Sequence, residues 1–377
     1  MAISDRAARM ALSRIVDGGD PELSASVERH GAQATLARLA EGGFGAALAR
    51  RAAGVDAELA ARSPMPEAVR FVVPGDEEWP DCLSDLGHGQ EVQRRGGVPF
   101  GLWLRGPGHL AALTERAVAV VGCRAATAYG SGVATELGAE LAEHGVTVVS
   151  GGAYGIDAAS HRGALAVDGP TVAVVANGVD VSYPPGNSSL FDWLGKDRLL
   201  VSELPPGAHP TRVRFLARNR LIAALSSGTV VVEAALRSGA RNTASWAMEC
   251  HRHLMAVPGP VHSPASATPH LMIRNGQATL VTSAVEVLEL VSGMGMALVP
   301  VPHGSSRPTD ELDGQRLAVF EAVPARRRRS VGAIALNAGV SIPECLAQLA
   351  ALEAAGLVDG SGAGWRALPV PATVAQS

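Results

Sequence analysis

The sequence is poor in cysteine, in aromatic residues and in long apolar runs, and each shortage excludes a class of protein. Its four cysteines stand far apart, with no C-x-x-C pair and no histidine at zinc-finger spacing. Neither a disulfide framework nor a structural zinc site is expected, and the thiols should be reduced. No run of about 18 apolar residues occurs, and the first residues lack the apolar core of a signal peptide. We expect a cytoplasmic protein with no membrane span, metal or cofactor.

The chain also has little net charge and is slightly acidic, with a formal charge of -4 and a pI near 6.3. That balance argues against a protein that coats itself in nucleic acid through overall basicity, so any such site must be a local patch. Between Leu204 and Val232 there is no acidic residue. The same stretch contains four arginines, Arg212, Arg214, Arg218 and Arg220. This imbalance is the sharpest electrostatic feature of the sequence.

Length and pattern divide the 377 residues into three folded parts and a linker. Residues 1–68 have apolar residues at helical intervals and no β-branched run, which predicts a small helical N-terminal domain. Residues 292–310 mix Gly, Pro and Ser and are typical of a linker. Residues 311–369 fit three helices and a hairpin, which predicts a C-terminal winged-helix domain. Its third helix should begin after Ser341 and stop at Gly356.

Residues 69–291 carry the main pattern, an extended lead-in followed by alternating strands and helices. The predicted strands, among them AVAVVG, VTVVSG and TVVVE, are short and continuously apolar. Strands of that kind are covered on both faces, so the fold class is α/β with a doubly wound parallel sheet, an extended Rossmann-like domain. Ligands of such sheets bind outside the carboxyl ends of the strands, which directs attention to the loops at those ends.

Two glycine-rich loops come after the first two strands of this sheet, VVGCRAATAYG and SGGAYGIDAASH. Backbone amides and a helix N-terminus at such a turn can bind an anion, and an arginine beside them suits phosphate. A tight turn with a solvated arginine is the alternative for the first loop. Asp157 and His161 are equally consistent with structural and ligand-touching roles. The candidate contacts in these loops are Arg124, Thr127, Gly151, Gly152 and Gly155.

The acid-free segment reads HPTRVRFLARNR and precedes an apolar helical stretch. Arginines that neutralise phosphates beside an aromatic ring that stacks on a base are what a single-strand groove requires. The ring is equally consistent with a place in the core, and the arginines with a solvated helix start. The candidate contacts in this segment are Arg212, Arg214, Phe215, Arg218, Asn219 and Arg220.

A third loop, EAALRSGARNTA, places Ser238, Gly239 and Thr243 at the start of a helix, where amides and hydroxyls can meet an anion. A polar N-capping loop is the alternative. The basic run 326–329 is predicted to be a solvated surface, with contact to a phosphate backbone as the alternative. The third helix of the winged part has no Arg or Lys, so we assign that domain to protein contact or regulation rather than to major-groove reading.

These motifs together resemble the DNA-processing protein A family, DprA or Smf, over about residues 70–368. Further motifs in the match are NGVDVSYPPGN, SELPPG and AVPGPV, with departures at Asn177, His251 and Thr268. The resemblance implies a non-enzymatic homodimer that binds single-stranded DNA, displaces or bypasses single-strand-binding protein, and loads RecA in transformation and homologous recombination. DNA contacts are implied at Arg124, Arg212, Phe215, Arg218, Asn219 and Arg220, with Gly151, Gly152 and Gly155 in the second loop.

The competing hypothesis is a nucleotide-processing hydrolase similar to the phosphoribohydrolases that activate cytokinins. Those enzymes need a P-G-G-x-G-T-x-x-E loop, whereas this chain has no glycine pair there and no acid following Thr243 within VVVEAALRSGARNTA. The G-x-G-x-x-G spacing of dinucleotide sites and the P-loop motif are also missing. No catalytic residue is predicted.

Overall fold

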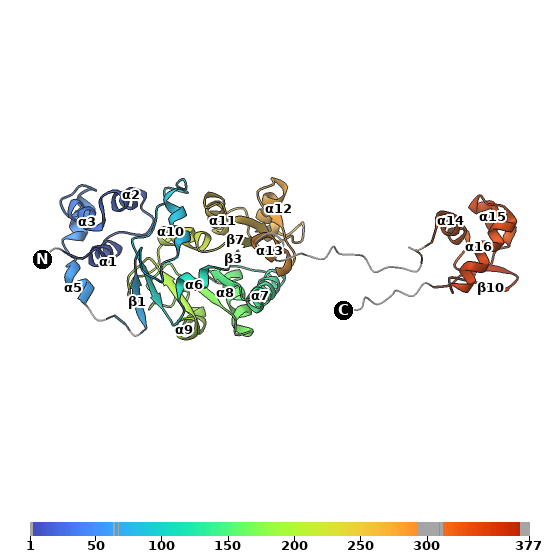
Figure 1. Cartoon of the computed structure of the whole chain (residues 1–377), viewed down its shortest axis with the longest axis horizontal. Coiled ribbons are helices and arrows are strands. Elements are labelled where there is room, and N and C mark those ends of the chain that lie inside the picture. The colour runs from blue at the N-terminus through green and yellow to red at the C-terminus, as the bar shows by residue number, and fades with distance from the viewer. Residues whose placement is uncertain (1–2, 63–64, 67, 293–308, 310–311, 370–377) are drawn as a thin grey trace. The chain divides into compact units, whose positions relative to one another are not determined.

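The computed structural model describes residues 3–62, 65–66, 68–292, 309 and 312–369, so the predicted linker 292–310 lies almost wholly outside them (Figure 1). Its contacts divide the chain into two compact units, residues 1–299 and 300–377. Each unit has an apolar core of its own. The predicted boundary at residue 68 falls within the first unit, so a separate N-terminal domain stays a prediction.

A nine-stranded sheet forms the centre of the first unit, in the order β1-β2-β6-β5-β4-β3-β7-β8-β9. Seven strands, β3 to β9, are parallel, which confirms the doubly wound sheet, while the lead-in adds β1 and β2 antiparallel at one edge. The strands are β1 (Val69–Val72), β2 (Leu102–Arg105), β3 (Ala117–Val121), β4 (Thr147–Ser150), β5 (Thr171–Val174), β6 (Leu199–Ser202), β7 (Gly228–Val231), β8 (His253–Ala256) and β9 (Thr279–Leu280).

Helices cover both faces of this sheet because successive strand residues point to opposite sides. Val118 and Val120 of β3 share one core with α7 and α8, whereas Ala119 and Val121 share another with α10 and α11. Figure 1 shows α7 and α8 on one side of the sheet and α10 and α11 on the other. The helical segments after the leader are η1 (Asp81–Gly87), α6 (Leu110–Thr114), α7 (Ala128–Glu143), α8 (Ile156–Ala166), η2 (Pro185–Asn187), α9 (Ser188–Asp197), α10 (Arg212–Ala224), α11 (Ala240–Glu249), η3 (Pro264–Ser266), α12 (Ala267–Arg274) and α13 (Ala284–Val291).

The leader consists of five short helices, α1 (Asp5–Ile15), α2 (Pro21–His30), α3 (Ala32–Ala40), α4 (Ala46–Ala52) and α5 (Ala57–Arg62). They enclose a small core, and α1 also joins the sheet directly. The buried indole of Trp103 on β2 donates to the Ser13 hydroxyl at 3.3 Å, and Arg6 donates to the Phe71 carbonyl of β1 at 2.6 Å. The leader is therefore packed on the antiparallel edge of the sheet.

The second unit has the three helices and hairpin expected of a winged helix: α14 (Gly314–Ala322), α15 (Val331–Ala338), α16 (Ile342–Ala354), β10 (Val358–Gly362) and β11 (Gly364–Ala367). Ser341 is the N-cap of α16, as predicted, and the structure adds a capping box between Ser341 and Glu344. Among the described residues no single helix has the length and apolarity to cross a membrane. Helices α15 and α16, which are bent relative to each other, meet the criteria only when they are taken together, and only by length and composition.

Candidate nucleic-acid interface

The direction of strand addition reverses at β3, which lies between β4 and β7. At such a switch point the loops after neighbouring strands diverge and leave a crevice at the carboxyl edge of the sheet. A cavity of about 350 Å³ occupies this crevice. It is lined by the loops after β3, β4 and β7 and by α10. Half of the fourteen predicted contacts line it, namely Arg124, Phe215, Arg218, Asn219, Ser238, Gly239 and Thr243.

Phe215 lies at this crevice on α10 and is only partly buried. The Arg124 guanidinium, from the β3 loop, lies over its ring at 4.6 Å from the centroid, and Arg218 approaches at 5.8 Å. The Tyr183 ring lies 5.8 Å away at a tilt of 52°. Sequence reasoning quoted the motif that contains Tyr183 but did not select this residue. An exposed cation and two aromatic rings therefore meet at one edge of the cavity.

Arg218 lies beneath this group and is buried, with 6% of its surface exposed. Its Nη1 donates to the Val174 carbonyl at 2.5 Å, while its Nε has no hydrogen-bond partner. Burial lowers the Arg218 pKa to about 10, and the charge of Asp157 opposes that shift. Arg218 thus remains a cation at neutral pH. It gives the cavity a positive floor rather than a mobile side chain at the surface.

The other three arginines of the acid-free segment have different surroundings. Arg212 is exposed at the first turn of α10, beside the N-cap Thr211. Arg214 forms an ion pair with Asp17 of the leader at 2.8 Å. Arg220 is fully buried and binds both carboxylate oxygens of Glu203, at 2.5 and 2.6 Å. Of the four arginines, only Arg212 is exposed and free of an ion pair in this described stretch.

The segment thus contains no acidic residue, but in the folded protein two of its arginines are paired with acids from outside it. Asp17 is 197 residues from Arg214, and Glu203 is 17 residues from Arg220. Both pairs cross between elements, so a local count of charges does not include them. Arg220 is placed to hold α10 against the loop after β6, and it presents no donor to solvent.

The glycines of the β4 loop allow close packing of neighbouring loops. A Cβ on Gly151 would lie 1.8 Å from Nη1 of Arg218, and one on Gly152 would lie 2.5 Å from the Phe191 ring. Gly155 has φ +78°, and its Cβ would lie 2.3 Å from the Cys123 carbonyl oxygen. These contacts are with protein atoms. The structure therefore gives the three glycines a packing role, and their contact with DNA stays a prediction.

Thr127 forms hydrogen bonds within the protein through both its hydroxyl and its backbone amide. Its hydroxyl caps α7 by accepting from the Gly130 amide and donates to the Glu233 carboxylate at 2.6 Å. The Thr127 amide donates to the same carboxylate at 2.9 Å. Glu233 is 1% exposed at the end of the β7 segment, so this bond ties the β3 loop to the β7 loop. These hydrogen bonds fix the position of the β3 loop relative to the β7 loop, and the two loops form opposite sides of the crevice.

The β7 loop closes the other side of the crevice. Gly239 is exposed and Ser238 is half-buried, with its hydroxyl accepting from the Ala240 amide at 3.3 Å. Thr243 is buried in α11. Asn219 donates to the Asn242 side chain at 3.1 Å, which joins α10 to α11. Ser238 and Gly239 are accessible to a ligand, and exposed Arg237, which was not among the candidate contacts, lies beside them.

Asp157 and His161, for which two roles were open, are both buried on α8, Asp157 in its first turn and His161 one turn further along. Asp157 accepts from the Ala153 amide at 3.4 Å, and burial raises its pKa although Arg218 opposes the shift. His161 is fully buried beside the Thr171 hydroxyl at 2.7 Å, and burial lowers its pKa to about 3. His161 is therefore in a structural position, whereas Asp157 both bonds to the β4 loop and lines the cavity beside Arg218. No group of three or more potential ligands is placed to hold a metal within the described chain.

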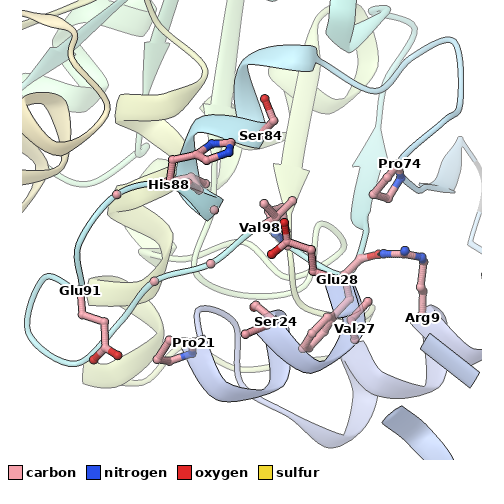
Figure 2. A pocket seen from close by; sticks show the side chains of 18 of the residues that line it. Arg9, Pro21, Ser24, Val27, Glu28, Pro74, Ser84, His88, Glu91 and Val98 are labelled. Carbon is pink, nitrogen blue, oxygen red and sulfur yellow. The ribbon is translucent and has the colours of Figure 1, made fainter. Parts of the chain in front are cut away.

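A second cavity, of about 430 Å³, lies between α2 and the lead-in (Figure 2). Val27 and Glu28 of α2 face the segment that carries His88 and Val98. Glu28 and Glu91 are exposed at this cavity, and neither forms an ion pair within the described residues. Two free carboxylates repel phosphate, so this cavity does not suit DNA.

Comparison with known proteins agrees with this geometry. The family model of DNA recombination-mediator protein A matches residues 70–292. The putative DNA processing protein DprA of Mycobacterium tuberculosis is 42% identical over 367 residues, which cover 95% of this chain and 93% of the relative. Protein Smf of Escherichia coli is 39% identical over 254 residues, covering 67% of each chain.

Two solved structures are also similar. DNA processing protein A of Streptococcus pneumoniae matches with a TM-score of 0.64 and 30% identity, over 78% of this chain and all of that one. The Helicobacter pylori protein, studied for its single-stranded DNA binding mode, matches with a TM-score of 0.50 and 25% identity, over 58% and 94%. With the family model covering more than half of its residues, the chain belongs to the DNA recombination-mediator protein A family.

Proposed function

We propose that this chain binds single-stranded DNA at the carboxyl edge of its sheet, at the crevice between the β3 and β7 loops. The observation that carries the proposal is the Arg124 guanidinium over the partly buried Phe215 ring, with exposed Arg212 on the same helix as Phe215. Phosphates need exposed cations, and unpaired bases stack on aromatic rings. The similar Helicobacter pylori protein, which binds single-stranded DNA, supports this assignment.

We propose further that DNA binding leads to no covalent reaction. The two acids nearest the cavity are both engaged, Glu233 by Thr127 and Asp157 by the β4 loop. A hydrolase of the phosphoribohydrolase type needs a carboxylate that is free to reach its substrate. Glu233 does not line the cavity, and Asp157, which does, is 7% exposed and accepts from the Ala153 amide. The alternative hydrolase hypothesis therefore gains no support from the geometry.

The recombination-mediator role of the family suggests that the bound strand is passed on to a recombinase. We infer that the protein acts as a homodimer, displaces or bypasses single-strand-binding protein, and loads RecA onto the strand during transformation and homologous recombination. A RecA strand-exchange assay with single-strand-binding protein present tests this step. Faster exchange with the wild type than with Arg124→Ala supports the inference, and equal rates with and without the protein contradict it.

DNA binding itself is tested by fluorescence anisotropy with labelled oligo-dT at several salt concentrations. Affinity should weaken with salt, because each phosphate neutralised contributes a slope of about -0.7 for a single strand. Arg124→Ala should reduce affinity. Arg116→Ala is a matched control, because this exposed arginine comes directly before β3, at the opposite end of that strand from the crevice, and forms no ion pair within the described residues. Salt-independent or absent binding by the wild type would refute the proposal.

A further inference from the structure

Tyr183 is an exposed aromatic residue beside the candidate interface, in the segment between β5 and α9. Tyr183 is 37% exposed. Its ring packs against Phe215, which lines the crevice, at a centroid distance of 5.8 Å. The tilt of 52° between the rings means that the Tyr183 face is not stacked flat on Phe215. A ring face therefore remains for another planar group.

The Tyr183 hydroxyl differs from those of the other two tyrosines in the chain. The Tyr129 hydroxyl donates to the Pro258 carbonyl at 2.6 Å, and the Tyr154 hydroxyl accepts from the Gly186 amide at 3.0 Å. That of Tyr183 has no hydrogen-bond partner among the described residues. Structural tyrosines commonly anchor their hydroxyl, so this ring is not held in place by its polar end.

The backbone on either side of Tyr183 is nevertheless fixed. Asn177, which is buried, donates from Nδ2 to the Val181 carbonyl at 2.6 Å, and Asn187 donates to the Gly152 carbonyl at 3.1 Å. The loop's acid, Asp180, accepts from the Gly207 amide at 2.8 and 3.0 Å. A ring displayed on a fixed loop loses little conformational entropy when a ligand stacks on it.

The order of the strands places Tyr183 in line with the predicted DNA contacts along the carboxyl edge of the sheet. We call this line of loops the track. Tyr183 comes after β5, Arg124 after β3, and Ser238 after β7, with β4 between the first two strands. Neighbouring strands are about 4.8 Å apart, so β5 to β7 spans about 14 Å.

We propose that Tyr183 is a second base-stacking residue of the single-strand site, next to Phe215 on the β5 side. The inference rests on the proposed function, because it needs DNA to occupy the crevice. It extends the track beyond the predicted contacts, which stop at α10 and the β3, β4 and β7 loops. The strand would run along the carboxyl edge of the sheet from the β7 loop, across Arg124 and Phe215, to the β5 loop.

The experiment measures oligo-dT affinity of the full chain for three substitutions at this position. Tyr183→Ala should weaken binding about 5- to 150-fold, the range for loss of one base–aromatic stack. Tyr183→Leu should weaken it similarly, because leucine keeps bulk against Phe215 without a flat ring. Tyr183→Phe should bind like the wild type. Trp193→Ala on α9 is the control, since Trp193 is 50% exposed and lines no part of the crevice.

A probe in which abasic sites replace the bases separates stacking from support of the fold. On that probe the wild type and Tyr183→Ala should bind equally, because no base is present to stack. Wild-type affinity of Tyr183→Leu for oligo-dT, or an equal loss by Tyr183→Ala on both probes, would overturn the inference alone. If the wild type does not bind oligo-dT, or Arg124→Ala leaves binding unchanged, the proposed function fails and the inference fails with it.

Discussion

The Arg124 guanidinium lies over the ring of Phe215, with 4.6 Å between Cζ and the ring centroid. One residue comes from the loop after β3 and the other from α10, so the contact joins two elements across the crevice. A cation–π contact at an exposed position is worth about 0.5–1 kcal/mol. It holds the cation at the mouth of the cavity before DNA arrives, which reduces the entropy lost on binding.

Replacement of Phe215 distinguishes stacking on a base from packing in the core. Phe215→Ala is expected to lower oligo-dT affinity by about 1–3 kcal/mol, because it removes both a stacking surface and the support of Arg124. Anisotropy measures the affinity, and thermal denaturation measures the folded fraction. An earlier melting transition with unchanged affinity per folded molecule would identify Phe215 as a core residue.

Arg212 and Arg214 stand two positions apart and should behave differently. Arg212→Ala is expected to reduce the slope of log K against log salt by about 0.7, since Arg212 is exposed and can neutralise one phosphate. Arg214→Ala should leave the slope unchanged and lower the free energy of unfolding by about 1 kcal/mol or less, because its partner is Asp17. Equal slopes for both variants would contradict this division.

Arg220 is expected to act on stability alone. Arg220→Met leaves the buried Glu203 carboxylate without its cation and should cost about 3–5 kcal/mol of unfolding free energy. The double variant Arg220→Met/Glu203→Leu should recover most of that loss, because no charge is left unpaired. Urea denaturation measures both. A large loss of DNA affinity by correctly folded Arg220→Met would show that this arginine also serves the interface.

Gly155 and Gly145 form a matched pair for the loop geometry. Both have positive φ, +78° and +69°, but only at Gly155 would a Cβ meet other atoms, the Cys123 carbonyl at 2.3 Å. Gly145→Ala should therefore cost about 1 kcal/mol of unfolding free energy. Gly155→Ala should cost about 3 kcal/mol or more and weaken DNA binding, because the β3 and β4 loops must separate. Equal costs in urea denaturation would refute the close approach.

His161 predicts a dependence of stability on pH. Its pKa of about 3 lies below the ordinary value of 6.5, so between these values the unfolded chain binds a proton that the folded chain does not. Stability of the wild type should thus fall as pH falls through this window, relative to His161→Gln, by up to about 1.4 kcal/mol per pH unit. The raised pKa of Asp157 acts in the opposite direction in both proteins and cancels in the difference.

Urea denaturation of both proteins at several pH values between about 4.5 and 7 measures this difference. A constant difference across the range would show that the imidazole is protonated in the folded protein as readily as in the unfolded one. Burial makes that outcome unexpected, because an imidazolium at this fully buried position loses its hydration and lies near the charges of Arg218 and Arg162.

The periodicity and composition of the sequence were sufficient to predict the parallel sheet and the helices that cover it. Continuous apolar runs separated by helical segments predict parallel strands covered on both faces, and β3 to β9 have that arrangement. Glycine-rich turns after β3 and β4 and the helix at FLARNR were found for the same reason, since local sequence sets where strands end and helices begin. The antiparallel pairing of the lead-in could not be predicted in this way, because β2 pairs with β6, and the sequence does not show which strand lies at the edge of the parallel part of the sheet.

The acid-free arginine stretch, the two glycine-rich loops and the third anion-binding loop could thus be recognised from the sequence alone, because residue type and spacing are local properties. Which arginines are available could not. Asp17 and Glu203 neutralise Arg214 and Arg220 from other elements, burial removes Arg218 from the surface, and Arg212 alone is left exposed without an ion pair in that described stretch. Tyr183 meets Phe215 only because β5 ends and α10 begins at the same edge of the sheet. Charge pairing and burial act through space, so only the tertiary structure decides them.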